Sequence, residues 1–255
     1  MARLTGKVAV ITGGAGGIGI EAGRIFAAEG AKVVLVDLAE GPLQQAVQTI
    51  GSEAVSYVIA DVTQPEQTQN YVRTAVERYG GIDIYLANAG IEGVVQPITD
   101  YPLDMFDRVL AVNVRGVWLG LKYVIPEMRK RGSGSIVITS SVAGIKGTAG
   151  VSAYTTSKHA VIGMMRTAAL ECAPSNIRVN CVNPAPIDTR MMRSLEEGFA
   201  PGAAEYAKQS IADRVPLKRY GSPQEVAQVM MFLVSDDSRY CTGGVYMVDG
   251  GMSAL

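Results

Sequence analysis

Residues 7–19 read KVAVITGGAGGIG, and this stretch decides the fold. A short apolar, β-branched run ends in a glycine-rich turn, and a segment of helical period over residues 18–29 follows at once. Gly13, Gly17 and Gly19 fit a strand–turn–helix unit in which the backbone approaches a pyrophosphate beside the free N–H groups and positive dipole end of the helix. A glycine-rich turn alone can also be an ordinary tight turn, so the rest of the chain has to decide between these interpretations.

Outward from this stretch, short apolar runs alternate with longer segments of helical period. Several runs are apolar on consecutive positions, which is typical of strands buried on both faces of a parallel sheet. The expected strands are residues 7–12, 31–37, 54–61, 82–89, 135–141, 177–184 and 245–249. The expected helices are residues 18–29, 42–50, 65–79, 102–131, 154–173 and 223–234. This alternation predicts an α/β fold, a Rossmann-type doubly wound parallel seven-stranded sheet with helices on both faces.

The composition excludes several classes of protein. Hydrophobic residues make up 48% of the 255 residues and charged residues 18%, which indicates a sizeable core rather than disorder. With 23 basic and 24 acidic side chains the net charge is -1, so we expect no nucleic-acid partner. His159 is the single histidine, and we expect no metal site.

The sequence favours a cytoplasmic protein with no membrane partner. No apolar run approaches the ~18 residues that a membrane span needs. The first apolar strand begins near Lys7, which leaves no room for a signal peptide. The cysteines, which form no C-x-x-C pair, fit three small buried side chains in a reducing compartment; they are Cys172, Cys181 and Cys241.

The residue that ends the second expected strand indicates which dinucleotide the turn binds. Asp37 follows the glycine turn by about 20 residues, where a carboxylate accepts hydrogen bonds from the adenine-ribose hydroxyls. A 2′-phosphate at the same place would be repelled by Asp37, and neither Gly16 nor Leu38 supplies a basic side chain. The sequence therefore predicts NAD rather than NADP.

Polar residues also follow the third and fourth expected strands. Asp61 and Val62 come after the third strand, and Asn88 to Gly90 come after the fourth. Open parallel sheets bind ligands at the carboxyl ends of their strands. A carboxylate on the adenine amino group and a glycine turn near the ribose are plausible roles, and loop capping is the alternative for each residue.

One further pair of residues is a candidate for a catalytic role. Tyr154 and Lys158 stand four residues apart, on one face of an expected helix. Such a spacing arises easily by chance in a chain of this length. Its position is more informative, because the pair opens the helix that follows the fifth strand and Ser141 closes that strand.

Taken together, these motifs resemble the short-chain dehydrogenase/reductase family, of the single-domain type of roughly 250 residues. The likeness covers essentially the whole chain. It rests on residues 12–19, Asp37, residues 61–62 and 88–90, Asn113, Ser141 in ITSSVAG, residues 154–158 and residues 183–189. One departure is Pro184-Ala185, where the family commonly has Pro-Gly, and the added methyl group lies beside the expected nicotinamide site.

The resemblance implies one NAD(P)-binding Rossmann domain over residues 1–255. The segment 189–220 breaks the alternation of strands and helices and is longer than a usual connection, so we interpret it as a substrate lid inserted in that domain. The implied cofactor-binding residues are Gly13, Gly17, Ile18, Gly19, Asp37, Asp61, Val62, Asn88, Gly90, Tyr154, Lys158, Pro184, Ile187 and Thr189.

The resemblance also implies four catalytic roles. Tyr154 would be the general acid/base, and lowering its pKa from ~10 towards 7 takes about 4 kcal/mol. Lys158, a cation at ~4 Å with an effective dielectric near 20, would supply about that much and also hold the nicotinamide ribose. Ser141 would hydrogen-bond the substrate oxygen. Asn113 would mark a local distortion of its helix that positions a water, unless it is a satisfied core amide.

The expected reaction is reversible hydride transfer between a secondary alcohol or ketone and nicotinamide C4. The candidate substrate-pocket residues are mostly apolar, namely Val142, Ile145, Ala185, Pro186, Met191 and Met192. They favour a small-molecule substrate with a cyclic or aromatic body, although packing of the lid on the body would explain them too. Arg190 and Arg193 lie close enough to keep an anionic group possible.

Two alternative functions remain, one an enzyme and the other a binding protein. A 3-oxoacyl-(acyl-carrier-protein) reductase shares these motifs and would use a basic docking surface such as residues 129–131, but such enzymes usually favour NADP, against which Asp37 argues. A nicotinamide-binding protein without catalysis is the second alternative, and the set Ser141, Tyr154 and Lys158 argues against it. Relatives of this type are commonly homotetramers, so we expect one here.

Overall fold

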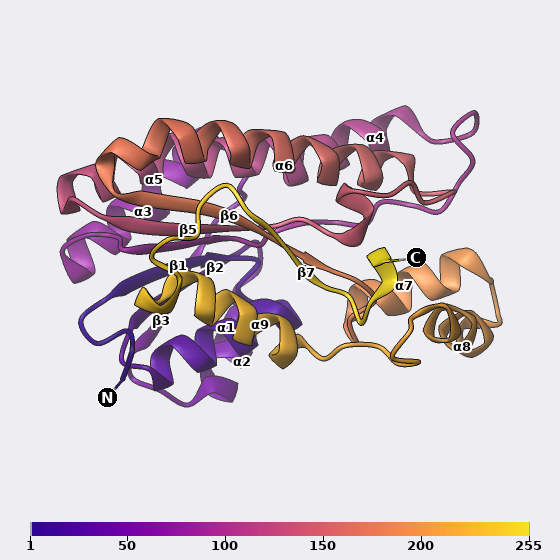
Figure 1. The fold of residues 1–255 in the computed structure, drawn as a ribbon, viewed down its shortest axis with the longest axis horizontal. Helices are drawn as coiled ribbons and strands as arrows, with labels where there is room; N and C mark the ends of the chain where they lie inside the picture. Colours follow the sequence, from indigo (N-terminus) through magenta and orange to yellow (C-terminus); the bar gives the residue numbers. More distant parts are fainter. Residues whose placement is uncertain (1, 255) are drawn as a thin grey trace.

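The computed structural model describes residues 2–254 and contains one seven-stranded parallel sheet. The strands lie in the order β3-β2-β1-β4-β5-β6-β7 (Figure 1). Their bounds are β1 (Val8–Thr12), β2 (Lys32–Asp37), β3 (Val55–Ile59), β4 (Ile84–Ala87), β5 (Gly134–Thr139), β6 (Ile177–Pro184) and β7 (Val245–Val248). The Rossmann-type doubly wound sheet is confirmed, and the strand order reverses between β1 and β4, where such sheets open a crevice.

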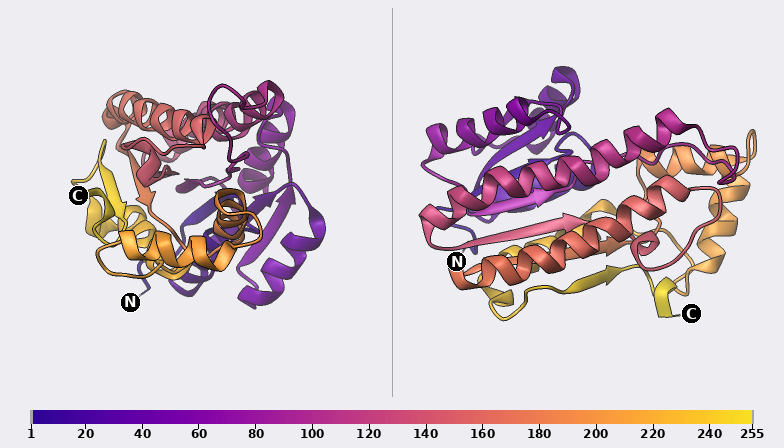
Figure 2. Two further views of the ribbon diagram at one scale, coloured as in Figure 1. Left: turned by 90° about the vertical axis from the view of Figure 1, so that its right-hand side faces the viewer. Right: turned by 90° about the horizontal axis from the view of Figure 1, so that it is seen from above.

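Helices cover both faces of the sheet. In Figure 1, α3, α5 and α6 lie above it and α1, α2 and α9 below it, and Figure 2 shows the same layers from two other sides. On each face of the sheet, apolar side chains of the strands and of the covering helices pack together into a core. The bounds are α1 (Gly17–Ala28), α2 (Glu40–Ile50), α3 (Pro65–Tyr79), α4 (Leu103–Leu110), α5 (Val117–Arg131), α6 (Ser152–Cys172) and α9 (Pro223–Val234).

The expected helix over residues 102–131 is three pieces rather than one. α4 and α5 are joined by a π-helical stretch, Ala111–Gly116, which contains Asn113. This is the local distortion expected around that residue. The whole run Leu103–Arg131 is long and apolar enough to cross a membrane by length and composition alone, and 44% of its most apolar window is buried inside the protein.

The expected lid segment, residues 189–220, contains two helices, α7 (Arg190–Phe199) and α8 (Ala204–Arg214). Both lie beyond the carboxyl ends of the strands, at the right of Figure 1. The segment leaves and rejoins the body at one point, because Ile187 and Gly221 form an isolated parallel bridge. Asp188 N donates to Gly221 O at 2.9 Å and Gly221 N donates to Pro186 O at 3.0 Å. We call these paired residues the neck.

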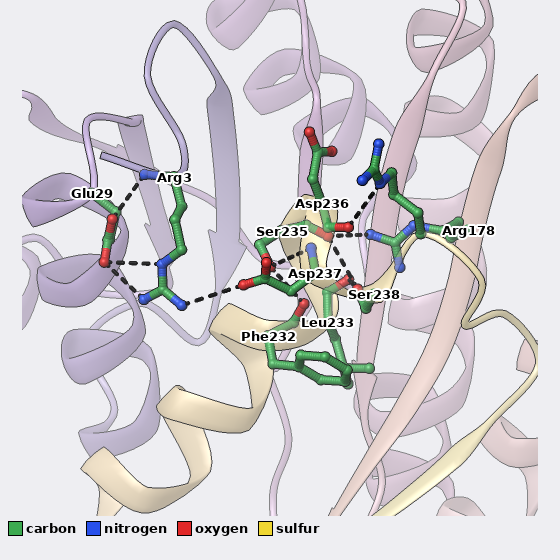
Figure 3. Close-up of polar contacts among 10 residues, drawn as sticks. Arg3, Glu29, Arg178, Phe232, Leu233, Ser235, Asp236, Asp237 and Ser238 are labelled. Atoms are coloured by element: carbon green, nitrogen blue, oxygen red, sulfur yellow. Dashed lines mark hydrogen bonds and ion pairs between the residues drawn. The ribbon is translucent and has the colours of Figure 1, made fainter. Parts of the chain in front are cut away.

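A polar network closes the opposite, amino-terminal end of the sheet (Figure 3). Arg3 contacts Glu29 at 2.7 Å and Asp237 at 3.7 Å, which ties the start of the chain to the turn after α9. Arg178, near the start of β6, donates to Ser235 O at 3.1 Å. Side-chain hydrogen bonds and ion pairs therefore connect the segments at this end of the sheet, whereas a cleft lies at the carboxyl ends of the strands.

Candidate active site

A cleft of about 990 Å³ opens at the carboxyl ends of β1, β4, β5 and β6, between the body and the lid segment. It begins at the glycine turn, which lies where the strand order reverses. Most residues that the sequence singled out line this one cleft, namely Gly13, Gly17, Ile18, Asp37, Asp61, Val62, Asn88, Gly90, Ser141, Val142, Tyr154, Lys158, Pro184, Ala185, Pro186, Ile187, Thr189, Met191 and Met192. The fold therefore brings together residues up to 179 positions apart in sequence, from Gly13 to Met192.

Three predicted site residues do not line the cleft. Gly19 lies behind the turn, where a Cβ would collide with the Gly13 carbonyl oxygen, so its role is to let the turn close. Asn113 is buried behind the cleft wall. Ile145, expected in the substrate pocket, is 43% exposed and lies outside the lining. Ile145 itself ends the short 3₁₀ turn Val142–Gly144, with φ -129° and ψ -10°, outside the helical range of that turn.

The glycine turn fits a pyrophosphate. Gly13 has φ +64°, and a Cβ there would lie 2.9 Å from the Ala89 Cα, so only glycine is tolerated without strain. α1 begins at Gly17 with no side-chain cap on its first N–H groups. Free N–H groups and the positive dipole end of a helix that face a cleft form a site for an anion.

Asp37 is fixed at the far end of the cleft. Its carboxylate accepts hydrogen bonds from Ala15 N at 3.0 Å and Leu38 N at 2.8 Å. Within residues 2–254 the cationic side chains lining the cleft come from α4, α6, α7 and α8, and none comes from the loop after β2; they are Arg108, Lys158, Arg190 and Arg214. The structure thus presents a carboxylate without a basic neighbour at the end of β2.

Asn88 is bound within the protein more fully than its sequence motif suggested. Its Nδ2 donates to Gly13 O at 3.3 Å, and its Oδ1 accepts from the Thr139 hydroxyl at 3.0 Å. Its backbone N donates to the Thr12 hydroxyl at 3.0 Å. Asn88 therefore joins the ends of β1, β4 and β5. The two threonines that hold it lie within the motifs 12–19 and ITSSVAG, but the sequence assigned them no role of their own.

The side chains Ser141, Tyr154 and Lys158 meet at the middle of the cleft. The Ser141 hydroxyl donates to Pro184 O at 3.4 Å and accepts from Ala143 N at 3.2 Å. Lys158 Nζ lies 5.4 Å from the ring centroid of Tyr154. Ser141 lies two residues beyond the observed end of β5, where it caps a short 3₁₀ turn instead of ending the strand.

The pKa values of this group differ from the expectation that Lys158 alone draws the Tyr154 phenol towards neutrality. Burial raises the pKa of Tyr154 to about 12, with the Ser141 hydrogen bond opposing and the nearby Glu92 carboxylate adding to the rise. Burial lowers the pKa of Lys158 to about 8. Burial is the largest cause of both shifts and disfavours the charged form of each group, so the pKa of Tyr154 lies above its ordinary value and not below it.

Lys158 is held by a backbone group that the sequence could not identify. Its Nζ donates to Thr139 O at 2.8 Å, and only 4% of the residue is exposed. Thr139 is the last residue of β5, so the end of this strand fixes the lysine directly below the ring of Tyr154.

The sequence allowed two interpretations of Asn113, a local helix distortion or a core amide with all its hydrogen bonds made, and the structure shows both features. The π-helical distortion is present, yet its amide is fully used by protein partners. Nδ2 donates to Ile91 O and to the Ser157 hydroxyl, both at 3.0 Å, and Oδ1 accepts from Ile91 N at 2.9 Å. Asn113 thereby ties the loop after β4 to α6, which carries Tyr154.

Residues of the lid segment, together with Met252 near the end of the chain, complete an apolar end of the cleft. Met191 and Met192 line it as expected, and α8 adds residues that sequence analysis missed, namely Tyr206, Ala207, Ser210, Ile211 and Arg214. Their spacing places them on one helix face, so a search for helical periodicity within residues 204–214 would have found them. Met252 also lines the cleft, and no local pattern could have shown this.

Among residues 2–254, no group of three or more His, Cys, Asp or Glu side chains is arranged to hold a metal ion.

Comparison with known proteins agrees with this architecture. A family model described as Enoyl-(Acyl carrier protein) reductase matches residues 13–253. Levodione reductase of Leifsonia aquatica is 39% identical over 99% of this chain and 96% of its own length. A crystal structure of levodione reductase matches with a TM-score of 0.97, covering 99% of this chain and 100% of that one.

Two further similar proteins carry the names of other activities. A 3-oxoacyl-(acyl-carrier-protein) reductase of Thermotoga maritima is 42% identical over 98% of this chain and 99% of its own length. The crystal structure of NAD+-bound xylitol dehydrogenase is 36% identical with a TM-score of 0.91, covering 98% of this chain and 100% of that one.

Proposed function

The chain belongs to the short-chain dehydrogenase/reductase family of NAD(P)-dependent oxidoreductases, and we propose that it is an NAD-dependent alcohol dehydrogenase/ketone reductase. The proposed substrate is a secondary alcohol or ketone with an apolar cyclic or aromatic body. One observation carries the proposal: Ser141, Tyr154 and Lys158 meet in the same cleft as the glycine turn and Asp37. A binding protein without catalysis would not need that set.

The protein's own groups handle the proton and hold the reactants. When bound, the nicotinamide ring supplies the hydride acceptor or donor and, in its oxidised form, a positive charge. In the oxidation direction Tyr154 takes the carbinol proton, while Ser141 donates a hydrogen bond to the substrate oxygen. Lys158, fixed by Thr139 O, favours the tyrosinate and is placed to bind the nicotinamide ribose.

The preference for NAD rests on Asp37. Both of its carboxylate oxygens already accept backbone N–H groups, so the side chain cannot swing away from a 2′-phosphate without losing these bonds. The electrostatic repulsion between this carboxylate and a 2′-phosphate disfavours NADP.

The apolar substrate end rests on the lid side chains. Met191, Met192, Leu195, Phe199 and Ile211 all line the cleft, and methionines adapt to irregular shapes. A cyclic or aromatic body fits such a wall better than a small polyol does.

Acyl-carrier-protein reduction is the second candidate, favoured by the description of the matching family model and by the Thermotoga relative. The geometry opposes the basic docking surface expected at residues 129–131. These residues end α5, and Arg131 pairs at 3.1 Å with Asp83, which precedes β4. They therefore lie at the amino-terminal end of the sheet, away from the cleft.

Absorbance at 340 nm tests the proposal. NAD and NADP are compared with a panel of linear, cyclic and aromatic secondary alcohols, and with an acyl thioester in the reverse direction. We expect turnover with NAD and a cyclic or aromatic alcohol, and its loss in Tyr154→Phe. Preference for NADP and the thioester would instead establish the second candidate. We also propose a cytoplasmic homotetramer, and light scattering of the purified protein would test the tetramer.

A further inference from the structure

An ion pair crosses from the loop after β4 to the lid. Arg190, the first residue of α7, donates to Glu92 from both terminal guanidinium nitrogens, Nη1 to Oε1 at 3.1 Å and Nη2 to Oε2 at 3.4 Å. The two side chains differ in exposure, because that of Glu92 is 8% exposed and that of Arg190 is 76% exposed. Neither residue belongs to a sequence motif that accounts for the pair.

Glu92 lies next to the catalytic groups, in a loop that is held in place by hydrogen bonds. The residue before it, Ile91, is bound through both backbone groups by Asn113. The carboxylate lies near enough to Tyr154 for its charge to act on the phenol. The loop therefore cannot follow the lid without breaking the contacts that organise the catalytic site.

Arg190 is at the end of α7 that covers the cofactor end of the cleft. The preceding residue, Thr189, approaches the glycine turn, since a Cβ at Gly17 would lie 3.4 Å from the Thr189 methyl group. The other end of α7 lies against the same loop, because a Cβ at Gly198 would lie 2.6 Å from Val95. These contacts with the loop after β4 are among those that hold α7 to the body.

We propose that the Glu92–Arg190 pair is a positioning contact that keeps α7 closed over the glycine turn and slows release of the nicotinamide cofactor. The inference rests on the proposed function. Within residues 2–254 Arg190 is the one side chain that hydrogen-bonds the Glu92 carboxylate. If α7 moved away, a buried carboxylate would lose its partner, and this opposes opening because an unpaired buried charge is strongly disfavoured. The exposed Arg190 side chain is solvated by water whether or not the pair is formed. The preference for the closed position of α7 therefore comes from the buried Glu92 carboxylate.

The test measures release of NADH directly. Protein loaded with NADH is mixed with excess NAD in a stopped-flow instrument, and the decay of bound NADH fluorescence gives the dissociation rate. The variants are Glu92→Gln, Arg190→Gln and the double variant. Lys208→Gln is the matched control, because Lys208 is a lid cation in α8 that does not line the cleft. Circular dichroism verifies folding of each, and Glu92→Gln leaves no buried charge behind.

We expect each single variant to release NADH about tenfold faster, a factor between the small effect of losing an exposed ion pair and the larger effect of breaking a buried one. The double variant should be no faster than the faster single variant, because both act through one contact. Rates within about twofold of the unaltered protein, or a double variant equal to the product of the singles, would overturn the inference. If the unaltered protein binds no NADH at all, the proposed function itself is wrong, so the two failures are distinguishable.

Discussion

Replacing Lys158 by methionine is expected to stabilise the folded protein at neutral pH while abolishing its activity. Burial lowers the pKa of Lys158 from 10.5 to about 8, so folding at pH 7 buries an ammonium group that water would solvate better. At 1.36 kcal/mol for each pKa unit this destabilises the fold by about 3 kcal/mol. Methionine has a similar shape but leaves Thr139 O without its donor, which costs about 1 kcal/mol. The net gain is therefore about 2 kcal/mol.

The pH dependence makes this prediction specific. The folded-state pKa lies below the unfolded one, so the penalty is complete below pH 8 and disappears as the pH rises from about 8 to 10.5. Differential scanning calorimetry should show Lys158→Met melting about 4–8 °C higher at pH 7, and the gain should shrink towards pH 10. A lower melting temperature at pH 7, or a gain that does not change between pH 7 and pH 10, would refute the reasoning.

Three other substitutions, the last with a control variant, have expected outcomes. Asp37→Ser should lower the NAD-to-NADP ratio of kcat/KM by about tenfold or more, and an unchanged ratio would contradict the role of the carboxylate. Gly13→Ala should destabilise the protein by about 1–2 kcal/mol in urea denaturation and weaken NADH binding in fluorescence titration, because its φ is +64°. Arg131→Ala should destabilise it by about 1–3 kcal/mol, since Asp83 is buried, whereas the exposed Arg73→Ala should change the unfolding free energy by less than about 0.5 kcal/mol.

The strands and the glycine turn were predictable because their signals are local. Apolar runs and helical periods place every strand end within two residues of its observed position. Asp37, Tyr154 and Lys158 could be placed in one site because strand ends of a parallel sheet meet at one edge. Local patterns therefore determine both the topology and the line of residues along the cleft.

The rest depends on contacts between distant parts of the chain. The π-helical break at Asn113 is held by Ile91 and Ser157, which no periodicity connects. Met252 lines the cleft, and Lys146 Nζ donates to its carbonyl oxygen at 2.8 Å, across 106 residues. The raised pKa of Tyr154 is a consequence of burial, which spacing alone does not reveal.

The neck has a consequence for how such proteins diversify. Its backbone bonds bring the two ends of the lid segment side by side, with Asp188 and Gly221 joined at 2.9 Å. The segment between them has a further backbone bond to the body, from Leu217 N to Gly250 O at 3.2 Å. A longer, shorter or chemically different segment that keeps this bond can be grafted there while every strand keeps its register. Under the proposed function, residues 189–220 can therefore be exchanged between relatives without moving Ser141, Tyr154 or Lys158, and such exchanges would show whether this segment selects the substrate.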